Sequence, residues 1–329
     1  MADVHALLLT AGLGTRLDPL TRLVAKAAAP LAGRTLAERA LAWVRRQGIR
    51  DVVLNLHYKP ETITGAIGDG THLDLRVRYS WEQPLLGSAG GPRHALDLLG
   101  SDPFLIVNGD TLCDVALAPM LKAHKRSGAQ ATLALVPNPS PDFYNGVRLD
   151  DQQRIVEFVP AGPDAAGTFH FIGIQVVGKS IFAPLADGVP AESVKGLYRD
   201  LVRTAPGVVC GWPLELPFVD IGTPEDYLRT ALAIAASEDG ASTVEAGAKV
   251  DPSARLKRSV VWADARVGAG ADLEDCIVAG PLTVPAGLHA RRTMILPAAL
   301  ARPGDPADVR DGVALFPLTG GETQAAEVD

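Results

Sequence analysis

A glycine-rich turn directly after the first apolar run is the feature that most restricts how this chain folds. The run 6–9 leads into Gly12 and Gly14, and Arg16 and Lys26 follow. Glycines at the end of a strand let the main chain come close to an anion and leave backbone N–H groups aimed at it. Arg16 adds a planar, permanently charged fork, and Lys26 adds a cation on a flexible stem. The stretch therefore predicts a cradle for a polyphosphate.

Two common phosphate-binding loops do not fit this turn. The dinucleotide fingerprint requires a third glycine where Leu17 stands, and the P-loop requires Gly-Lys-Ser/Thr, which the stretch lacks. A nicotinamide-linked oxidoreductase would also need an acid after the second strand, where the chain has Asn55-Leu-His57. These differences exclude both loops and argue against an oxidoreductase.

Residues 12–31 resemble the signature of the sugar-1-phosphate nucleotidyltransferases, G-x-G-T-R-h-x-P-h-T-x-x-x-P-K-x-h-h-P-h, in which h is apolar. Ala25, in place of the proline before Lys26, is the one clear departure. The resemblance implies that Arg16 and Lys26 are catalytic. It also implies nucleotide contacts from residues at and after the end of the first strand, which are Leu9, Ala11, Gly12, Gly14 and Thr15.

Strand-like and helix-like segments alternate over about the first 235 residues. This alternation predicts an α/β fold with a Rossmann-like mixed, mostly parallel sheet and helices on both faces. Ligands of such sheets bind beyond the carboxyl ends of the strands. Strands are predicted at 51–56, 73–79 and 104–107, and helices between Thr35 and Gly48, at 60–67 and at 93–99.

Several short strands follow, separated by turns rich in Pro, Gly, Asp and Asn. They are predicted at 132–136, 146–149, 154–158 and 169–177. We interpret them as a mixed or antiparallel extension that forms the sugar side of the cleft. A nucleotidyltransferase domain is thereby placed at 1–238, with a nucleotide half over about 1–130 and a sugar half over about 131–238.

A different pattern begins after Gly240. Aliphatic residues recur at steps of six, six, five, six and six, at Val244, Val250, Leu256, Val261, Val267 and Leu273. A sixfold apolar repeat is typical of the hexapeptide left-handed β-helix, in which each face contributes one inward side chain. We expect about three short coils at 241–298, with a role in oligomerisation. A loose tail is expected at 299–329, to which 313–318 could add one strand.

Two aspartates stand where they could hold a divalent cation. Asp110 follows the apolar strand 104–107, and Asp220 lies just before the helix start Thr223-Pro224. Mg²⁺ prefers carboxylate oxygens, usually one or two from the protein, and fills its other positions with phosphates and water. The resembled family has metal-binding aspartates in a G-D motif and in a D-I/V-G-T-P motif. The resemblance therefore implies that Asp110 and Asp220 bind Mg²⁺.

A second glycine-rich segment follows the predicted strand 73–79. Leu86-Gly-Ser-Ala-Gly resembles the L-G-T-A-G element of the family, which implies that Gly87 and Ser88 contact the base and the ribose. Small residues suit this role because a flat base can stack against bare backbone. We also expect Asn108 in the nucleotide site, since it ends the apolar strand before Asp110.

The sugar half matches the family less completely. Tyr144-Asn-Gly-Val resembles the Y-G-V element and implies sugar contact by Gly146, and Gly173 is the matching glycine of the N-A-G-I element. The F-x-E-K-P element, whose Glu and Lys hold the sugar and its phosphate, is replaced by Phe158-Val-Pro. Glu157 and His170 lie nearby and are the candidate substitutes.

Charge and cysteine usage restrict the partners and the compartment. The formal net charge is −7, so nothing draws the whole chain towards nucleic acid or an anionic membrane. Cys113, Cys210 and Cys276 are scattered without metal-type spacing, which suits reduced thiols. Asp3 stands where a signal peptide would be basic, and the first apolar run is too short to span a bilayer. We expect a cytoplasmic protein.

These features predict an enzyme that transfers a nucleotidyl group from an NTP to a sugar-1-phosphate and releases pyrophosphate. The layout most resembles bacterial mannose-1-phosphate guanylyltransferases, which favours GTP as the nucleotide and a homo-oligomer formed through the β-helix. A uridylyl- or thymidylyltransferase acting on another hexose-1-phosphate is one alternative. The other is a non-catalytic subunit that senses a nucleotide sugar, which Ala25 and the missing Glu-Lys pair would favour.

Overall fold

The computed structural model describes residues 4–112, 114–238 and 243–318, so Cys113, the junction at 239–242 and the end of the predicted tail lie outside the described residues. The chain divides into two compact units. The first is made of Met1–Gly12 and Ala37–Val219, and the second of Leu13–Leu36 and Asp220–Asp329. The segment 13–36 is thus grouped with residues after 219, and the predicted domain bounds 1–238, 241–298 and 299–329 stay predictions.

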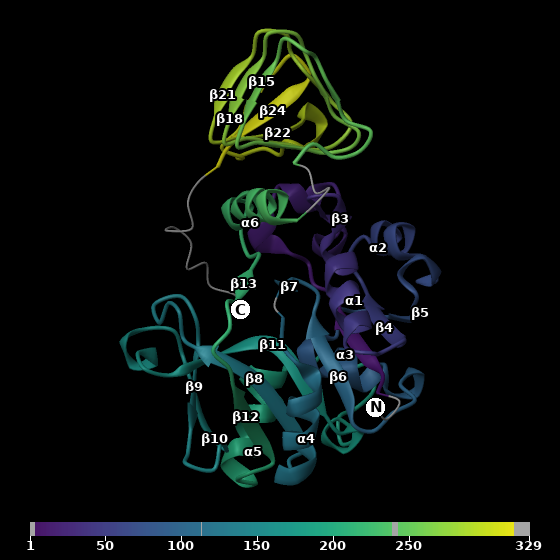
Figure 1. The fold of residues 1–329 in the computed structure, drawn as a ribbon, viewed down its shortest axis with the longest axis vertical. Coiled ribbons are helices and arrows are strands. Elements are labelled where there is room, and N and C mark those ends of the chain that lie inside the picture. Colours follow the sequence, from purple (N-terminus) through teal and green to yellow (C-terminus); the bar gives the residue numbers. More distant parts are fainter. Residues whose placement is uncertain (1–3, 113, 239–242, 319–329) are drawn as a thin grey trace. The chain divides into compact units, whose positions relative to one another are not determined.

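The first unit is built on a nine-stranded mixed sheet (Figure 1). Its central strands are parallel in the order β6-β1-β4-β5, and β11 adds to β6 in the antiparallel direction. From β11 the sheet continues to β9 and β10 and also to β8 and β12. The strands are β1 (Ala6–Leu9), β4 (Asp51–Leu56), β5 (Arg76–Trp81), β6 (Phe104–Asn108), β8 (Ala131–Pro137), β9 (Gly146–Leu149), β10 (Ile155–Val159), β11 (Phe169–Val177) and β12 (Val209–Pro213).

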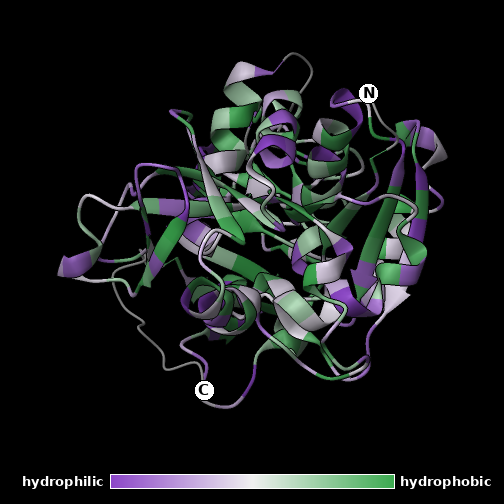
Figure 2. Cartoon of the chain, turned by 90° about the horizontal axis from the view of Figure 1, so that it is seen from below, coloured by the Kyte–Doolittle hydropathy of each residue, from purple (hydrophilic) through white to green (hydrophobic). Residues whose placement is uncertain are grey.

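Helices lie on both faces of this sheet. Figure 2 shows the mostly hydrophobic strands between helices that carry hydrophilic residues. The helices are α1 (Leu36–Arg46), α2 (Pro60–Ile67), α3 (Gly87–His94), α4 (Leu117–Ser127) and α5 (Tyr198–Thr204), the last preceded by a π-helical turn (Ser193–Leu197). Short 3-10 turns lie at Thr71–Leu73, Leu96–Leu98, Pro163–Ala165 and Lys179–Ile181.

The core of the first unit lies between the sheet and these helices. All six residues of β4 are buried, because a parallel strand that is covered on both faces has no solvent side. Members of the core come from β1, β4, β6, β8 and α5, and include Leu7, Val53, Phe104, Ile106, Leu133 and Tyr198. The predicted mixed α/β fold with parallel central strands is therefore confirmed.

Two elements differ most from their predicted bounds, while others differ by a residue at either end. The strand predicted at 73–79 begins at Arg76 instead, because Thr71–Leu73 form a 3-10 turn and Asp74 takes a positive φ of 56°. The helix predicted at 93–99 begins earlier, at Gly87, and ends at His94. Glycine has a low helix propensity, so the sequence alone does not favour this early start. It is explained by the close packing of α3 on other parts of the unit.

The second unit combines the segment 13–36 with α6 (Pro224–Ser237) and a strand-rich C-terminal region. Thr223 caps α6 in a reciprocal capping box with Asp226, as expected for a helix that starts at Thr223-Pro224. The segment 13–36 contains 3-10 turns at Thr15–Leu17, Leu20–Arg22 and Lys26–Ala28 and the small hairpin of β2 (Pro30–Leu31) and β3 (Arg34–Thr35).

Three parallel ladders form the C-terminal region: β14-β17-β20, β15-β18-β21 and β16-β19-β22. In each ladder the partner lies 17 residues further along the chain, as in Lys249↔Arg266 and Arg266↔Thr283. The strands are β14 (Lys249–Val250), β15 (Arg255–Lys257), β16 (Val260–Val261), β17 (Arg266–Val267), β18 (Asp272–Glu274), β19 (Ile277–Val278), β20 (Thr283–Val284), β21 (His289–Arg291) and β22 (Thr293–Pro297).

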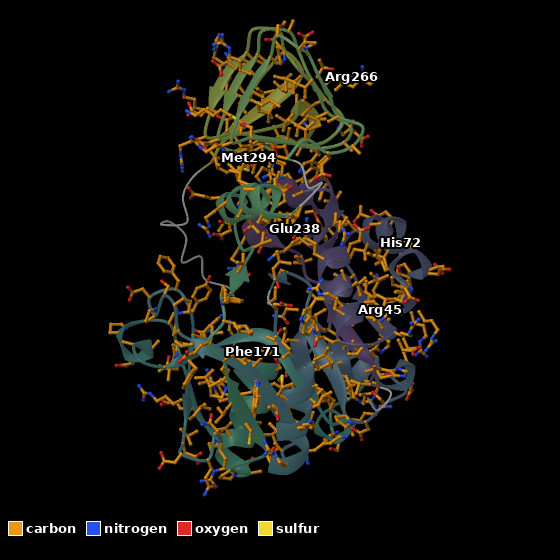
Figure 3. All side chains as sticks on the ribbon, viewed as in Figure 1. Arg45, His72, Phe171, Glu238, Arg266 and Met294 are labelled. Atoms are coloured by element: carbon orange, nitrogen blue, oxygen red, sulfur yellow. The ribbon has the colours of Figure 1, made fainter. Side chains whose placement is uncertain are left out.

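Side chains alternate between the inside and the outside of these ladders. Arg266 is exposed and extends outward (Figure 3), whereas the neighbouring Val267 is 3 % exposed. The recurring aliphatic residues found in the sequence line the interior, including Val261, Val267 and Leu273. After the 3-10 turn Ala298–Leu300, β24 (Val313–Pro317) pairs antiparallel with β22 and β23 (Asp308–Arg310). The predicted tail thus holds two strands before residue 319.

Two further short strands are β7 (Thr111–Leu112) and β13 (Val219–Asp220). Among the described residues, no helix is long and apolar enough to cross a membrane.

Candidate active site

Three strands of the first unit end together at one edge of the sheet. Leu9 at the end of β1 is in register with Asn55 of β4 and with Asn108 of β6. The N–H of Gly109 donates to the Leu9 carbonyl oxygen at 2.9 Å. A Cβ at residue 109 would lie 2.7 Å from that oxygen, so only glycine fits between Asn108 and Asp110. Asp110, half-buried, therefore follows the strand at the sheet's carboxyl edge.

A buried amide holds the start of the glycine-rich turn. The Asn55 Oδ1 atom accepts from the N–H groups of Thr10 at 2.6 Å and Ala11 at 3.3 Å, and the Thr10 hydroxyl donates to the Asn55 carbonyl. Asn55 Nδ2 donates in turn to Glu82 Oε1 at 2.7 Å. Asn55 and Glu82 are 3 % and 4 % exposed, so this arrangement is fixed in the interior.

The same buried acid anchors the segment expected to contact the base. Glu82 Oε2 accepts from the Leu86 N–H at 2.9 Å, directly before α3. A Cβ on Gly91 would lie 2.5 Å from Glu82 Oε1, so α3 can approach the acid because residue 91 is a glycine. Asn55 and Glu82 therefore connect the glycine-rich turn with the Leu86-Gly-Ser segment. This role was not predicted, although a polar residue inside the apolar run 51–56 was a signal for it.

The glycine-rich segment is also braced by residues far along the chain. Gly87 takes a φ of 75°, and a Cβ there would lie 2.6 Å from Glu192 Oε1. The Ser88 hydroxyl donates to Glu192 Oε2 at 2.6 Å, and the Ser193 N–H donates to Ser88 Oγ at 2.8 Å. Ser88 thus has protein partners in this structure, and Glu192 is a neighbour that the sequence did not indicate.

Gly173 brings the predicted sugar half against the predicted nucleotide half. β11 is irregular between Phe171 and Gln175, and Gly173 there has a φ of 78°. Asn108 occupies the space beside it, within 2.6 to 2.8 Å of where a Cβ would stand. Gly146 is equally restricted, since a Cβ on it would lie 2.2 Å from the Thr168 hydroxyl.

The remaining candidates of the sugar half lie in two different settings. Glu157 in β10 is exposed and pairs with Arg148 at 2.9 Å across the β9–β10 ladder. His170 lies in a ring cluster, 4.4 Å from Tyr144 and 5.3 Å from Phe218 between ring centroids. Burial lowers the pKa of His170 below its usual range, because the ring cluster disfavours the charged imidazolium.

The cationic part of the signature lies in the second unit. Gly14 takes a φ of 64°, and a Cβ on it would lie 2.9 Å from Cβ of Lys26 and 3.0 Å from Cγ2 of Thr21. Glycine at residue 14 therefore lets the turn fold directly onto the stem of Lys26. Thr15 begins a 3-10 turn, whose first N–H groups have no partner within the turn.

Arg16 and Asp220 meet within this unit. Arg16 Nη1 lies 3.6 Å from Asp220 Oδ2, and the two side chains are 65 % and 14 % exposed. A Cβ on Gly222 would lie 2.7 Å from the same Arg16 nitrogen, so Gly222 leaves room for the guanidinium. The exposed side of Arg16 can therefore face an anion while Asp220 holds its other side.

Asp110 and Asp220, the two predicted metal ligands, belong to different units. Within the described residues, no group of three or more His, Cys, Asp or Glu side chains is arranged to hold a metal ion.

Comparison with known proteins identifies the class. The family model described as nucleotidyl transferase matches residues 5–237, and the chain belongs to this family. A mannose-1-phosphate guanylyltransferase from Mycobacterium tuberculosis is 31 % identical over 295 residues, which cover 87 % of this chain and 82 % of the relative. A D-glycero-alpha-D-manno-heptose 1-phosphate guanylyltransferase from Aneurinibacillus thermoaerophilus is 30 % identical, covering 69 % of this chain and 96 % of the relative.

Solved structures show the same fold. The crystal structure of HddC from Yersinia pseudotuberculosis complexed with GMP-PN has a TM-score of 0.61 at 21 % identity, covering 70 % of this chain and 99 % of that one. A putative glucose-1-phosphate thymidylyltransferase from Bacillus anthracis has a TM-score of 0.63 at 17 % identity, covering 73 % and 98 %.

Proposed function

We propose that this chain transfers the guanylyl group of GTP to mannose-1-phosphate and forms GDP-mannose and pyrophosphate. The Arg16–Asp220 contact beside Gly222 carries the proposal, because it joins the two signature motifs of a nucleotidyl transferase in one cationic and acidic constellation. The guanylyltransferase names of the relatives from M. tuberculosis and A. thermoaerophilus support the choice of base and of a manno-configured sugar.

The chemistry asks the protein to position two polyanions. A phosphate oxygen of the sugar-1-phosphate attacks the α-phosphorus of the triphosphate, a new P–O bond forms, and the bond to the β-phosphate oxygen breaks so that pyrophosphate leaves. The nucleophile is already a dianion near neutral pH, since its second pKa is about 6. No general base is then required. Arg16 and Lys26 stabilise the charge that develops on the departing oxygen.

We assign the neighbouring residues as follows. The main chain at Leu9, Ala11, Gly12, Gly14 and Thr15 lies along the triphosphate, and Gly87, Ser88 and Asn108 lie along the nucleoside. Gly146 and Gly173 admit the sugar, with Glu157 as a further candidate at the rim of the sugar site.

If Lys26 binds the phosphates of both substrates, removal of its side chain should lower the activity strongly. We expect Lys26→Ala to lower turnover by more than about tenfold, and a smaller loss would remove that role.

Asp110 and Asp220 would hold a divalent ion, for which we propose Mg²⁺. When bound, such an ion neutralises phosphate charge and polarises the phosphorus that is attacked. Their carboxylates are the hard oxygen donors that Mg²⁺ prefers, and Asp220 is held by Arg16 at 3.6 Å.

We also propose that the C-terminal ladders are a short left-handed β-helix that joins subunits. Three parallel ladders with a 17-residue offset and an aliphatic interior support this interpretation. Short coils bury little surface by themselves, which favours their packing on other elements or on a second copy.

The alternatives predict different results in one experiment. Pyrophosphate release would be measured with Mg²⁺ for four ribonucleoside triphosphates and dTTP, each against several sugar-1-phosphates. Asp110→Asn protein would serve as the inactive variant and Asp97→Asn, an exposed acid of the same unit, as its matched control. Release with GTP and mannose-1-phosphate that is lost only in Asp110→Asn supports the proposal.

Release with UTP or dTTP instead would identify a uridylyl- or thymidylyltransferase. This alternative is tested because a relative from Synechocystis, named UTP–glucose-1-phosphate uridylyltransferase, is 27 % identical and covers 71 % of this chain. Binding of a nucleotide sugar without any release would favour the sensing subunit.

A further inference from the structure

A small cavity on the first unit shares no residue with the proposed active site. It lies where α4 packs against β12, and Figure 1 labels both elements. Its volume is about 370 Å³, and it is lined by Pro119, Lys122, Lys125, Arg126 and Trp212. Three of these five residues are cations that line it mainly with their aliphatic stems, and the other two offer ring surfaces.

The cations come from one face of α4. Residues 119, 122 and 126 are spaced by three and four, which places them on the same side of a helix, and Lys125 lies beside them. All three cations are exposed, and none has a carboxylate partner within the part of the chain that the structure describes. The cluster is therefore positive on a chain whose net charge is −7.

The dipole of α4 is a simpler explanation for part of this cluster. Lys125 and Arg126 stand in the last turn of α4, where positive charge complements the helix dipole. Lys122 lies one turn earlier and gains little from that effect. The dipole therefore does not account for the cations as a group, nor for the cavity between them and β12.

Trp212 gives the cavity its second unusual property. It stands in β12 opposite Ala134 of β8, and its side chain is half-buried. Its indole Nε1 is buried and has no hydrogen-bond partner among the described residues. Buried indole N–H groups usually find an acceptor, which makes this unpaired group unusual.

We propose that this cavity binds a nucleoside phosphate at a second, non-catalytic site. A flat base stacks on the Trp212 indole beside the Pro119 ring, and the phosphates meet Lys122, Lys125 and Arg126. Stacking on an aromatic side chain and salt-dependent contacts from Lys and Arg are the usual means of holding such ligands. The volume is within the range of small-molecule sites, which favours one compact ligand over an extended acidic peptide.

The site can be observed through the indole itself. Each tryptophan side chain gives one ¹⁵N–¹H resonance, and the sequence has four tryptophans, so Trp212→Phe protein assigns the relevant peak. The full chain would be titrated with ADP, with pyrophosphate and with adenosine. ADP is chosen because the active site is proposed to prefer guanine. We expect ADP to move the Trp212 resonance in a saturable way and to bind more tightly than pyrophosphate or adenosine.

Two variants separate a built site from surface charge. Lys122→Ala/Lys125→Ala should weaken ADP binding by about tenfold or more, because two charge-assisted hydrogen bonds to the phosphates are removed. Arg199→Ala, which removes an exposed cation of α5 without a described partner, should leave ADP binding unchanged.

Three results would overturn the proposal. The first is no movement of the Trp212 resonance with ADP. The second is equal binding of pyrophosphate and ADP, which would show an electrostatic surface without base recognition. The third is movement with a polyglutamate peptide but not with ADP, which would assign the cavity to an acidic protein segment. Since the resonance reports on Trp212 alone, failure of the proposed guanylyltransferase activity would not produce any of these results.

Discussion

The Asn108 side chain lies against Gly173, with its Nδ2 atom 2.6 Å from the place that a Cβ on Gly173 would take. Asn108 ends β6, the last of the parallel central strands, and Gly173 lies at the irregularity of β11, the first antiparallel strand. This contact is where the predicted nucleotide and sugar halves of the sheet meet. A side chain at residue 173 would have to displace Asn108, which we assign to the nucleotide site.

Gly173→Ala should therefore impair activity more than folding. Its Cβ would push on Asn108, and a shift of about 1 Å at a substrate-positioning residue can lower kcat/KM by up to about a hundredfold. Gly167→Ala is the matched control, because Gly167 has a similar φ of 72° but no atom within 4 Å of its Cβ position. Both variants carry the same backbone strain. Equal activity of the two would show that the Asn108 contact has no functional weight.

The elements predicted correctly are those whose signals lie within one short stretch. The strand 51–56, the helix 60–67 and the strand 169–177 were predicted with the observed bounds, because apolar runs and flanking glycine or proline fix them locally. The signature 12–31 is likewise contiguous. Local patterns of this kind identify both the fold class and the family.

What the sequence did not reveal depends on contacts between distant residues. The start of α3 was missed because Gly90 and Gly91 oppose a helix locally, yet both lie too close to Val189 and Glu82 for any other residue. The Asn55–Glu82 pair joins positions 27 residues apart. The Arg16–Asp220 contact likewise joins the segment 13–36 to a residue far along the chain, which no local pattern indicates.

Loss of the Asn55 amide should disturb both segments that it joins. In Asn55→Ala, the N–H groups of Thr10 and Ala11 lose their acceptor and Glu82 loses a donor, all in the interior. We expect a higher KM for the nucleotide and a lower kcat, together with a loss of stability of about 1–3 kcal/mol per unpaired buried group. Steady-state kinetics and urea unfolding measure the two effects.

Gln47→Ala provides the comparison, because the Gln47 amide also accepts from a backbone N–H, that of Leu117, but at the start of α4 and not in the glycine-rich turn. A nucleotide KM that rises equally in both variants would argue that Asn55 acts through general stability alone.

Tyr227 should be essential to the packing of the second unit. Its hydroxyl, fully buried in α6, donates to the Pro30 carbonyl and accepts from Trp262 Nε1 at 2.9 Å. Tyr227→Phe leaves the carbonyl of half-buried Pro30 and the N–H of buried Trp262 without this partner, and an unpaired buried group costs about 1–3 kcal/mol. Tyr79→Phe is the control, because the Tyr79 hydroxyl also donates to a carbonyl, that of Gly68, but at a partly exposed position. We expect a lower unfolding midpoint in urea only for Tyr227→Phe.

Acid should destabilise the second unit through Asp305. The Arg22 guanidinium, which pairs with Asp18 and Asp305 and lies over the Phe316 ring, lowers the pKa of Asp305 from 3.8 to about 2. The unfolded chain therefore binds the proton more readily than the folded one below about pH 4. The stability that this pair provides is complete above that pH and is lost as the pH falls towards 2.

Asp305→Asn removes the titrating group, so this part of the pH dependence should disappear. Circular dichroism during acid titration would follow the unfolding, with Asp264→Asn, an exposed acid of the same unit, as the control. We expect a weaker dependence between pH 4 and 2 for Asp305→Asn and an unchanged one for Asp264→Asn. Parallel curves for the parent and Asp305→Asn would show that the pair does not contribute.

The shape of the Arg16 side chain, and not only its charge, should matter for catalysis. Its guanidinium is placed between Gly222 and Asp220, with 65 % of the side chain exposed to an incoming anion. A planar fork can bind phosphate through two N–H groups while it keeps the carboxylate contact, which a lysine ammonium cannot reproduce. Arg16→Lys should therefore lower kcat/KM by about a hundredfold, equivalent to about 2.7 kcal/mol of transition-state stabilisation.

Arg203→Lys is the control, because Arg203 forms an exposed pair with Asp200, and it should have no effect on the rate. If Arg16→Lys retained activity within about tenfold of the parent, positive charge alone would suffice at this position, and the fork geometry would have no catalytic role.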